Sequence, residues 1–145
     1  MKIIKRYQQT EAHDWLGEAA ESIVRYYFSR IGLYAYGASR WGGDAVIQEP
    51  ITGKMLVIEI KSTDREGSSN RLKRSLKKKL SKLKPNVKAS IYAEVRLKDS
   101  KTNQNQELLV TLWKIKSGKM DLDSKCNDLR VDNLKGWIKH QFQWQ

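Results

Sequence analysis

Asp44, Glu59 and Lys61 could together perform chemistry, because the sequence places them at one end of a predicted β-hairpin. Apolar segments at 44–47 and 55–60 flank a turn-forming Pro-Ile-Thr-Gly sequence, a pattern typical of two strands joined by a tight turn. A turn centred on the Ile-Thr pair matches residues whose numbers sum to 103, which sets Asp44 opposite Glu59. Side chains alternate along a strand, so Glu59 and Lys61 share one face, and the two isoleucines beside Glu59 point to the other.

Two carboxylates placed opposite each other on neighbouring strands repel, and a divalent cation between them relieves the repulsion. Mg²⁺ takes oxygen ligands and typically uses one or two protein carboxylates, which Asp44 and Glu59 can supply. The backbone carbonyl of Ile60 and the carboxylate of Glu21, on a preceding helix, are further candidate ligands. A metal held in this way activates water and stabilises the charge that develops on a scissile phosphate.

Lys61 suits a third role in such a site, either positioning and deprotonating the attacking water or neutralising the charge on the phosphate. An amine beside carboxylates stays protonated, which favours the electrostatic role. The competing interpretation is a solvated strand face with no function. The apolar residues around Glu59 instead indicate a strand buried on both faces, where a charge requires a partner.

Other kinds of site find little support in the sequence. His13 and His140 are far apart and Cys126 is the single cysteine, so no zinc-ligand set can be assembled. Neither a glycine-rich phosphate loop nor a dinucleotide-binding fingerprint is present, and Ser39 lacks the partners of a nucleophilic triad.

Length and charge restrict the class of protein. A chain of 145 residues fits one domain, and 28 Lys and Arg against 16 Asp and Glu give a formal net charge of +12. Such an excess favours a polyanionic partner, with nucleic acid ahead of an acidic membrane or protein. The lone cysteine, and the absence of an apolar leader or membrane-length segment, lead us to expect a cytoplasmic, intracellular protein without membrane association.

The patterns along the chain predict an α/β protein with helices packed on a mixed sheet. We expect a polar arm, a helix that Asp14 caps and Gly32 closes, three strands, a basic helix, two strands and a terminal helix that Asp132 caps. The tail could instead pack as an arm or a dimer contact. The ranges are 1–12 for the arm, 14–31, 71–84 and 133–144 for the helices, and 33–36, 44–47, 55–60, 89–97 and 107–115 for the strands.

The helix expected at 71–84 carries a narrow leucine stripe, and all its charged residues are basic. The stripe indicates packing on the sheet, whereas cations without acids to pair with favour contact with phosphates. The residues that we expect to bind the DNA backbone here are Arg71, Lys73, Arg74, Lys77 and Lys78.

Asp44, followed fifteen positions later by Glu59-Ile60-Lys61 and preceded by a helix with a leading acid, resembles the PD-(D/E)XK nuclease superfamily. Within it, GEAAESIVRYYFSRIGLYAYGASRWGGDAVI followed by MLVIEIKST is most similar to the archaeal-type Holliday junction resolvases. Those proteins have a helix with an AExE-like acid, a Gly-aromatic strand, a loop with serine and glycine, the aspartate and an ExKxT strand. The resemblance covers roughly residues 15–64, and Gly43 stands where those resolvases often have proline.

The resemblance implies a restriction-endonuclease-like fold, with a mixed five-stranded sheet flanked by helices in a single nuclease domain over 1–145. Residues 117–145 have no counterpart and form a C-terminal extension. Glu21, or alternatively Glu18, becomes the helix acid beside Asp44 and Glu59 as metal ligands, and Lys61 becomes the catalytic lysine. The loop residues that contact the scissile strand are then Ser39 and Arg40.

The function expected from the resemblance is a Mg²⁺-dependent endodeoxyribonuclease, with Mn²⁺ as a substitute metal. It would hydrolyse phosphodiester bonds in Holliday junctions or other branched DNA and act as a homodimer in DNA recombination. Two alternatives stay open: a nuclease of the same superfamily that cuts duplex DNA in restriction, homing or repair, and a non-catalytic nucleic-acid-binding protein with the same fold.

Overall fold

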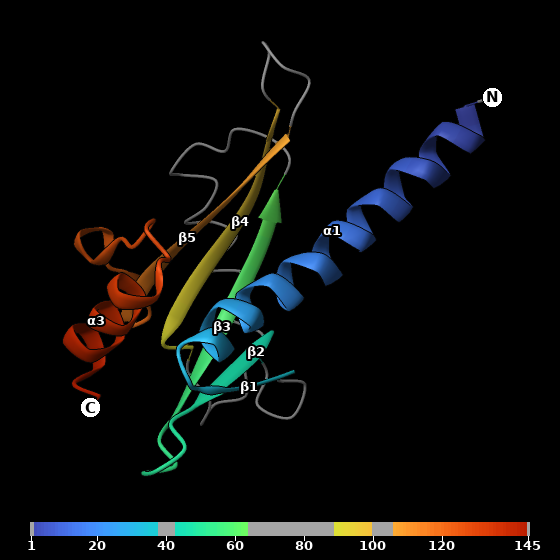
Figure 1. Cartoon of the computed structure of the whole chain (residues 1–145). Helices are drawn as coiled ribbons and strands as arrows, with labels where there is room; N and C mark the ends of the chain where they lie inside the picture. Colours follow the sequence, from blue (N-terminus) through green and yellow to red (C-terminus); the bar gives the residue numbers. More distant parts are fainter. Residues whose placement is uncertain (1, 38–42, 64–88, 100–105, 145) are drawn as a thin grey trace.

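The computed structural model describes residues 2–37, 43–63, 89–99 and 106–144, without the side chains of residues 2–15, 63, 98, 99 and 106. The elements in chain order are α1 (Lys2–Arg30), β1 (Tyr34–Gly37), β2 (Ala45–Gln48), β3 (Met55–Thr63), β4 (Ile91–Asp99), β5 (Gln106–Lys116), β6 (Lys119–Met120), the 3₁₀ helix η1 (Leu122–Ser124) and α3 (Val131–Phe142). Figure 1 shows α3 and the C-terminal part of α1 lying against the sheet, whereas the N-terminal part of α1 projects away from it.

The six described strands form one sheet in the order β1-β2-β3-β4-β5-β6. β3 and β4 are parallel, and the other neighbours are antiparallel. The prediction of an α/β protein with a mixed sheet is therefore confirmed. Five strands were predicted from the sequence, and β6 is the additional one. It forms because Ser117 and Gly118 adopt positive φ angles of 53° and 73°, which fold the chain back onto β5.

The β2–β3 hairpin has the predicted register. Ala45 pairs with Ile58 and Gln48 pairs with Met55, so the paired numbers sum to 103 as expected. The Glu49 carboxylate holds the turn, because it accepts hydrogen bonds from the backbone N–H groups of the two residues after Pro50, at 3.0 and 2.5 Å. The turn therefore fixes which residues of the two strands lie opposite each other.

Helix α1 begins at Lys2, so the prediction of a polar arm over 1–12 and of a cap at Asp14 is wrong. No glycine or proline interrupts residues 2–16, and residues of ordinary helix propensity continue the helix backward from its packed half. The predicted end is confirmed, since Gly32 follows the helix with a φ of +90°.

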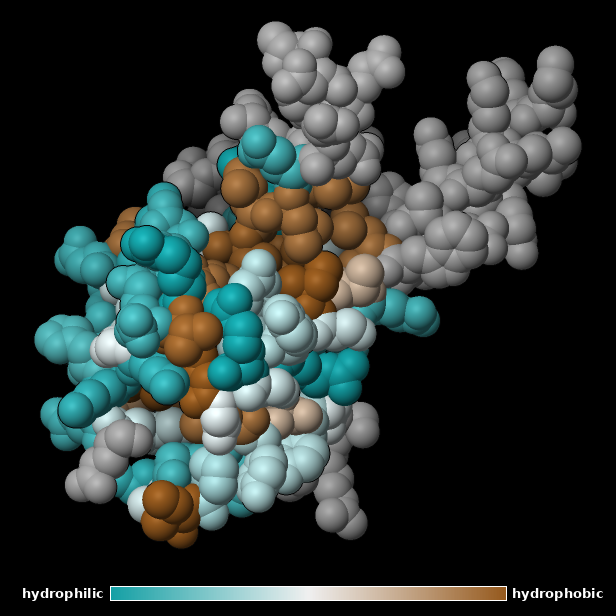
Figure 2. All heavy atoms as spheres, in the orientation of Figure 1, coloured by the Kyte–Doolittle hydropathy of each residue, from teal (hydrophilic) through white to brown (hydrophobic). Residues whose placement is uncertain are grey.

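Both helices cover the same face of the sheet with apolar side chains. Ala20, Val24 and Phe28 of α1 are buried at intervals of four residues, and they join Leu134 and Ile138 of α3 in one core with the strands. Figure 2 shows that this side of the molecule is hydrophilic over α3 and hydrophobic near the upper strand ends. Among the helices of the described chain, none is both long and apolar enough to cross a bilayer.

The opposite face of the sheet carries a smaller aromatic cluster. Tyr92 and Trp113 lie side by side with ring centroids 5.8 Å apart, and Val57 packs against them. The two faces of β3 therefore have different neighbours. Leu56 and Ile58 pack in the core under the helices, whereas Val57 packs in the aromatic cluster.

The C-terminal segment packs on the core. Helix α3 starts at Val131 with Arg130 as its N-cap, so Asp132 lies in its first turn and the predicted cap at Asp132 is wrong. There Asp132 faces the positive end of the helix dipole, where a negative charge stabilises the helix. Trp137 and Trp144 are buried, so the tail forms part of the core and is not an extended arm.

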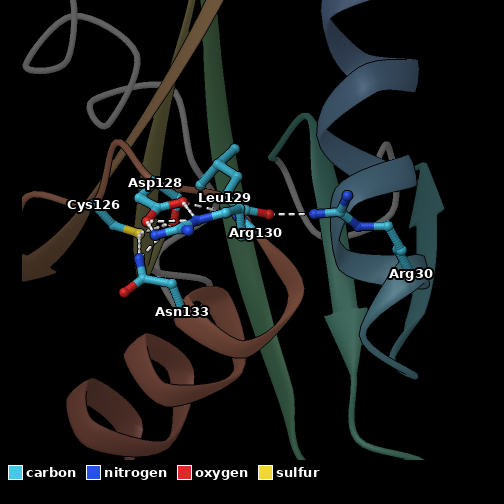
Figure 3. Close-up of polar contacts among 6 residues, drawn as sticks. All are labelled: Arg30, Cys126, Asp128, Leu129, Arg130 and Asn133. Carbon is cyan, nitrogen blue, oxygen red and sulfur yellow. Dashed lines mark hydrogen bonds and ion pairs between the residues drawn. The ribbon is translucent and has the colours of Figure 1, made fainter.

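Polar contacts tie this segment to α1, as Figure 3 shows. The guanidinium of Arg30 donates to the carbonyl of Leu129. Asp128 and Arg130 form an ion pair at 2.6 Å, and Asn133 donates to the Asp128 carbonyl at 2.5 Å. The hydrogen bonds from Arg130 lower the pKa of Asp128. The end of α1 and the start of α3 are thus held by one exposed polar cluster.

We expect Trp137→Phe to lower the free energy of unfolding by about 2–3 kcal/mol, as measured by urea denaturation. The indole Nε1 donates to the carbonyl of Ser124 at 2.7 Å in a buried position, so the substitution leaves that carbonyl without its donor and adds a cavity. Tyr26→Phe on the exposed side of α1 is the control and should change stability by less than about 0.5 kcal/mol. Equal stability of the two variants would contradict this account.

Candidate active site at the β2–β3 hairpin

Asp44 lies where the antiparallel pairing of β2 and β3 ends. β2 starts at Ala45, which pairs with Ile58, whereas β3 continues to Thr63, so the backbone of β3 after Ile58 extends past the start of β2. Asp44 makes hydrogen bonds to β3 at the point where β2 no longer pairs with it. Its backbone N–H donates to the Ile58 carbonyl at 3.0 Å, and its carboxylate Oδ2 accepts the backbone N–H of Ile60 at 2.7 Å. These two bonds fix the carboxylate of Asp44 against β3.

Glu59 is 3% exposed and belongs to the face of β3 that carries Val57, opposite the helices. Gly43 packs directly over this face. A Cβ added to Gly43 would lie 2.4 Å from Val57 Cγ1 and 3.5 Å from Glu59 Oε1. Only glycine fits here without a shift of its neighbours, and the structure thus brings the backbone before Asp44 onto the carboxylate of Glu59.

Lys61 is half-buried and follows Glu59 by two residues on β3, so both side chains share a face as predicted. The carbonyl of Ile60, the fourth predicted oxygen ligand, stays a candidate on geometric grounds. In an antiparallel ladder the N–H and C=O of one residue point to the same neighbouring strand. Because the N–H of Ile60 reaches Asp44, its carbonyl is directed toward that side as well.

Glu21 is half-buried on α1, and Glu18 is exposed. Helix α1 packs through Ala20 and Val24 on the face of the sheet opposite Glu59. Within the described ranges there is no cluster of three or more His, Cys, Asp or Glu side chains suited to a metal. The structure holds Asp44 against the backbone of β3, one residue from Glu59, and the roles of Asp44, Glu59 and Glu21 as metal ligands stay predictions.

The predicted DNA-binding residues lie outside the residues that the structure describes. They are Ser39 and Arg40 before Asp44, and Arg71, Lys73, Arg74, Lys77 and Lys78 of the expected basic helix.

Two titratable residues of β4 lie beside the site, and neither was predicted from the sequence. In the parallel register Glu59 lies beside Tyr92, and Lys61 lies beside Glu94. Both β4 side chains are buried, with exposed fractions of 0% and 8%. An acid within a run of apolar residues was a visible signal in the sequence, but its position beside Lys61 depends on the pairing of β3 with β4.

Burial dominates the electrostatics of these two residues. It raises the pKa of Glu94, and the positive charges of Arg96 and Lys125 oppose the shift. Burial and the charges of Glu94 and Glu59 raise the pKa of Tyr92, so its hydroxyl keeps its proton. That hydroxyl is the buried side-chain atom without a hydrogen-bond partner in the described part of the chain. It is a donor close to two carboxylates.

A hollow of 460 Å³ lies at the β5 side of the sheet and includes Glu94 in its lining. Basic side chains from four segments line it, namely Arg30 of α1, Arg96 of β4, Lys125, and Arg130 just before α3. Arg130 is already paired with an aspartate, as Figure 3 shows. The hollow therefore offers guanidinium and ammonium groups next to the strand that neighbours Lys61.

Neither the cysteine nor the described histidine considered in the sequence lies in the candidate site. Cys126 is buried, and burial raises the pKa of its thiol to about 11, which leaves it an inert core residue at neutral pH. His140 is exposed on α3. Comparison of the chain with protein-family models, curated proteins and solved structures gives no match.

We expect the free energy of unfolding of Asp44→Asn to exceed that of Asp44→Ala by about 1–2 kcal/mol, as measured by urea denaturation. The carbonyl of asparagine can still accept the N–H of Ile60, whereas alanine leaves that N–H, in a buried stretch of β3, without its acceptor. Equal stability of the two variants would show that the contact does not support the fold.

The raised pKa of Glu94 predicts that Glu94→Gln is more stable than the wild type at pH 7. A carboxyl group whose pKa is higher in the folded protein holds its proton more tightly there, so its ionisation opposes folding. The wild type should lose stability relative to the variant as the pH rises from below the ordinary value of 4.5 through the raised pKa.

Urea unfolding at pH 4 and pH 7 measures this difference. The same substitution at exposed Glu107 is the matched control for loss of one negative charge. A Glu94→Gln variant that loses stability at pH 7 would mean that the carboxylate has a favourable partner when charged.

Proposed function

We propose that this chain is a Mg²⁺-dependent endodeoxyribonuclease whose active site contains Asp44, Glu59 and Lys61. The observation that carries the proposal is the position of Asp44. Its carboxylate accepts the backbone N–H of Ile60 at 2.7 Å, one residue along β3 from Glu59, which is almost completely buried. Carboxylate oxygens that lie this close along one strand are ligands that a divalent cation can bind.

The donor set suits magnesium. Mg²⁺ is commonly bound by one or two carboxylates and keeps several waters, so Asp44 and Glu59 are sufficient without a third acid. When bound, the metal would activate water and stabilise the charge on the reacting phosphate. Asp44 would present an oxygen whose orientation the backbone of β3 fixes, and the Ile60 carbonyl is the next oxygen along that edge.

Lys61 would supply positive charge on the same face of β3. Its ammonium would attract the scissile phosphate and stabilise the extra negative charge in the transition state. The resemblance to PD-(D/E)XK nucleases implies Glu21 of α1 as a further ligand, and the site does not depend on it.

DNA is the substrate that the charge of the whole chain supports. A net charge of +12 attracts a polyanion, and the basic hollow at the β5 side adds cations within the described chain. The resemblance to archaeal-type resolvases makes branched DNA, including Holliday junctions, the first substrate to test, with a homodimer as the acting form inside the cell. Cutting of plain duplex DNA is the alternative for the same site.

One observation favours a second candidate function. The carboxylate of Asp44 accepts the hydrogen bond of a backbone N–H on β3, so it has a structural role even without a metal. A protein that binds nucleic acid with this fold but does not cut it would keep Asp44 for that reason.

A cleavage assay separates these functions. Wild-type protein is incubated with four-way junction, duplex and single-stranded DNA, with Mg²⁺ or with a chelator. We expect Mg²⁺-dependent cutting, and a loss of at least about a hundredfold in rate for Asp44→Asn, Glu59→Gln and Lys61→Ala. Lys135→Ala, at an exposed lysine of α3 on the other side of the sheet, is the control and should keep the wild-type rate.

Each outcome selects one function. DNA binding without Mg²⁺-dependent cutting by the wild type supports the non-catalytic protein and rejects the nuclease. Equal cutting of junction and plain duplex keeps the nuclease and rejects junction specificity. Full activity of the Lys61→Ala variant would reject the role of that lysine.

A further inference from the structure

The face of the sheet that carries Glu59 also carries two exposed tyrosines at its β1 edge. Tyr34 pairs with Gln48, and Tyr36 pairs with Val46, which in turn pairs with Val57. Paired residues of antiparallel strands point to the same face. Tyr34 and Tyr36 therefore project on the side of Val57 and Glu59, away from the helices.

These tyrosines form an unusual apolar surface for a protein with this charge. Tyr34 and Tyr36 are 53% and 43% exposed, and their ring centroids lie 6.2 Å apart. Met55, which pairs with Gln48 on the same face, is 39% exposed. We call the surface of Tyr34, Tyr36 and Met55 the aromatic platform.

The platform lies next to the candidate active site. Asp44 directly precedes β2 and is two residues before Val46, the partner of Tyr36, so Tyr36 and Asp44 occupy diagonal positions at this edge of the β1–β2 pair. Diagonal neighbours are about 7–8 Å apart, within reach of an aromatic side chain. A nucleic acid strand whose phosphate reaches Asp44 would thus pass its bases close to Tyr36.

We propose that the aromatic platform stacks on unpaired nucleobases of the nucleic acid, and that the substrate therefore contains single-stranded nucleotides next to the bond that is cut. The proposal rests on the proposed function, because it assumes that nucleic acid binds this face. Bases within a duplex are already stacked on one another, whereas an unpaired base exposes its ring face to a tyrosine.

The chemistry of the surface favours this occupant over an apolar one. Tyrosine rings combine a flat apolar face with a polar hydroxyl, and such rings beside cations are the usual surface for single-stranded nucleic acid. Here exposed Lys54 lies in the β2–β3 turn next to Met55, Lys61 lies on the same face, and the chain carries a charge of +12.

The test compares double variants at Tyr34 and Tyr36, with leucine or with phenylalanine. Binding is measured in chelator, without cutting, to duplex DNA and to DNA of the same sequence with a short single-stranded gap that contains 2-aminopurine. We expect the leucine variant to bind gapped DNA at least about tenfold more weakly and to lose the quenching of 2-aminopurine. The phenylalanine variant should resemble the wild type, since it keeps both rings.

Two controls test whether the loss of binding is specific to the aromatic platform. Tyr26→Leu, at an exposed tyrosine of α1, should leave binding unchanged. Urea unfolding and sedimentation of each variant report folding and oligomeric state. Equal weakening for duplex and gapped DNA, or no weakening, would overturn the platform. A leucine variant that changes only its oligomeric state would assign the surface to a second copy of the chain and also overturn it.

The platform and the proposed function fail in different ways. If the wild type binds neither DNA, the proposed function is rejected together with the platform. If the wild type binds and cuts DNA but the leucine variant behaves like the wild type, only the platform is rejected.

Discussion

The hydrogen bond from the backbone N–H of Ile60 to the carboxylate of Asp44 is the contact on which the candidate site depends. β2 is shorter than β3, so the ladder between them stops before β3 does, and a buried N–H beyond its end needs an acceptor. Asp44 provides one from the first position outside β2. The position at which β2 starts along β3 therefore determines where the carboxylate of Asp44 lies.

The division of the sheet into two faces explains how charged groups are tolerated beside the core. The helices bury the apolar side chains of one face, which supplies most of the favourable burial. The other face can then hold Glu59, Lys61 and Glu94. The raised pKa of Glu94 shows that burial of an acid on this face has a cost. Such costs are typical of sites retained for chemistry rather than for stability.

The parts of the structure that depend on local sequence were predictable, and those that depend on distant pairing were not. The turn after Glu49 fixed the β2–β3 register, and alternation assigned Glu59 to its face. The position of Glu94 beside Lys61 could not be predicted, because the register of two parallel strands is not set by any turn between them. The start of α1 at Lys2 was missed because its first turns lack a capping signal, although their residues permit a helix.

A structural role for Asp44 does not compete with a role in binding a metal. An ionised carboxylate has about four lone-pair sites, so accepting the N–H of Ile60 does not by itself prevent the group from binding a metal. The same bond orients the group, as second-shell hydrogen bonds orient metal ligands in general. Gly43 strengthens this arrangement, since its lack of a side chain lets the backbone approach Val57 and Glu59. In the proposed nuclease, the contact that ends the ladder would therefore also orient Asp44 as a metal ligand.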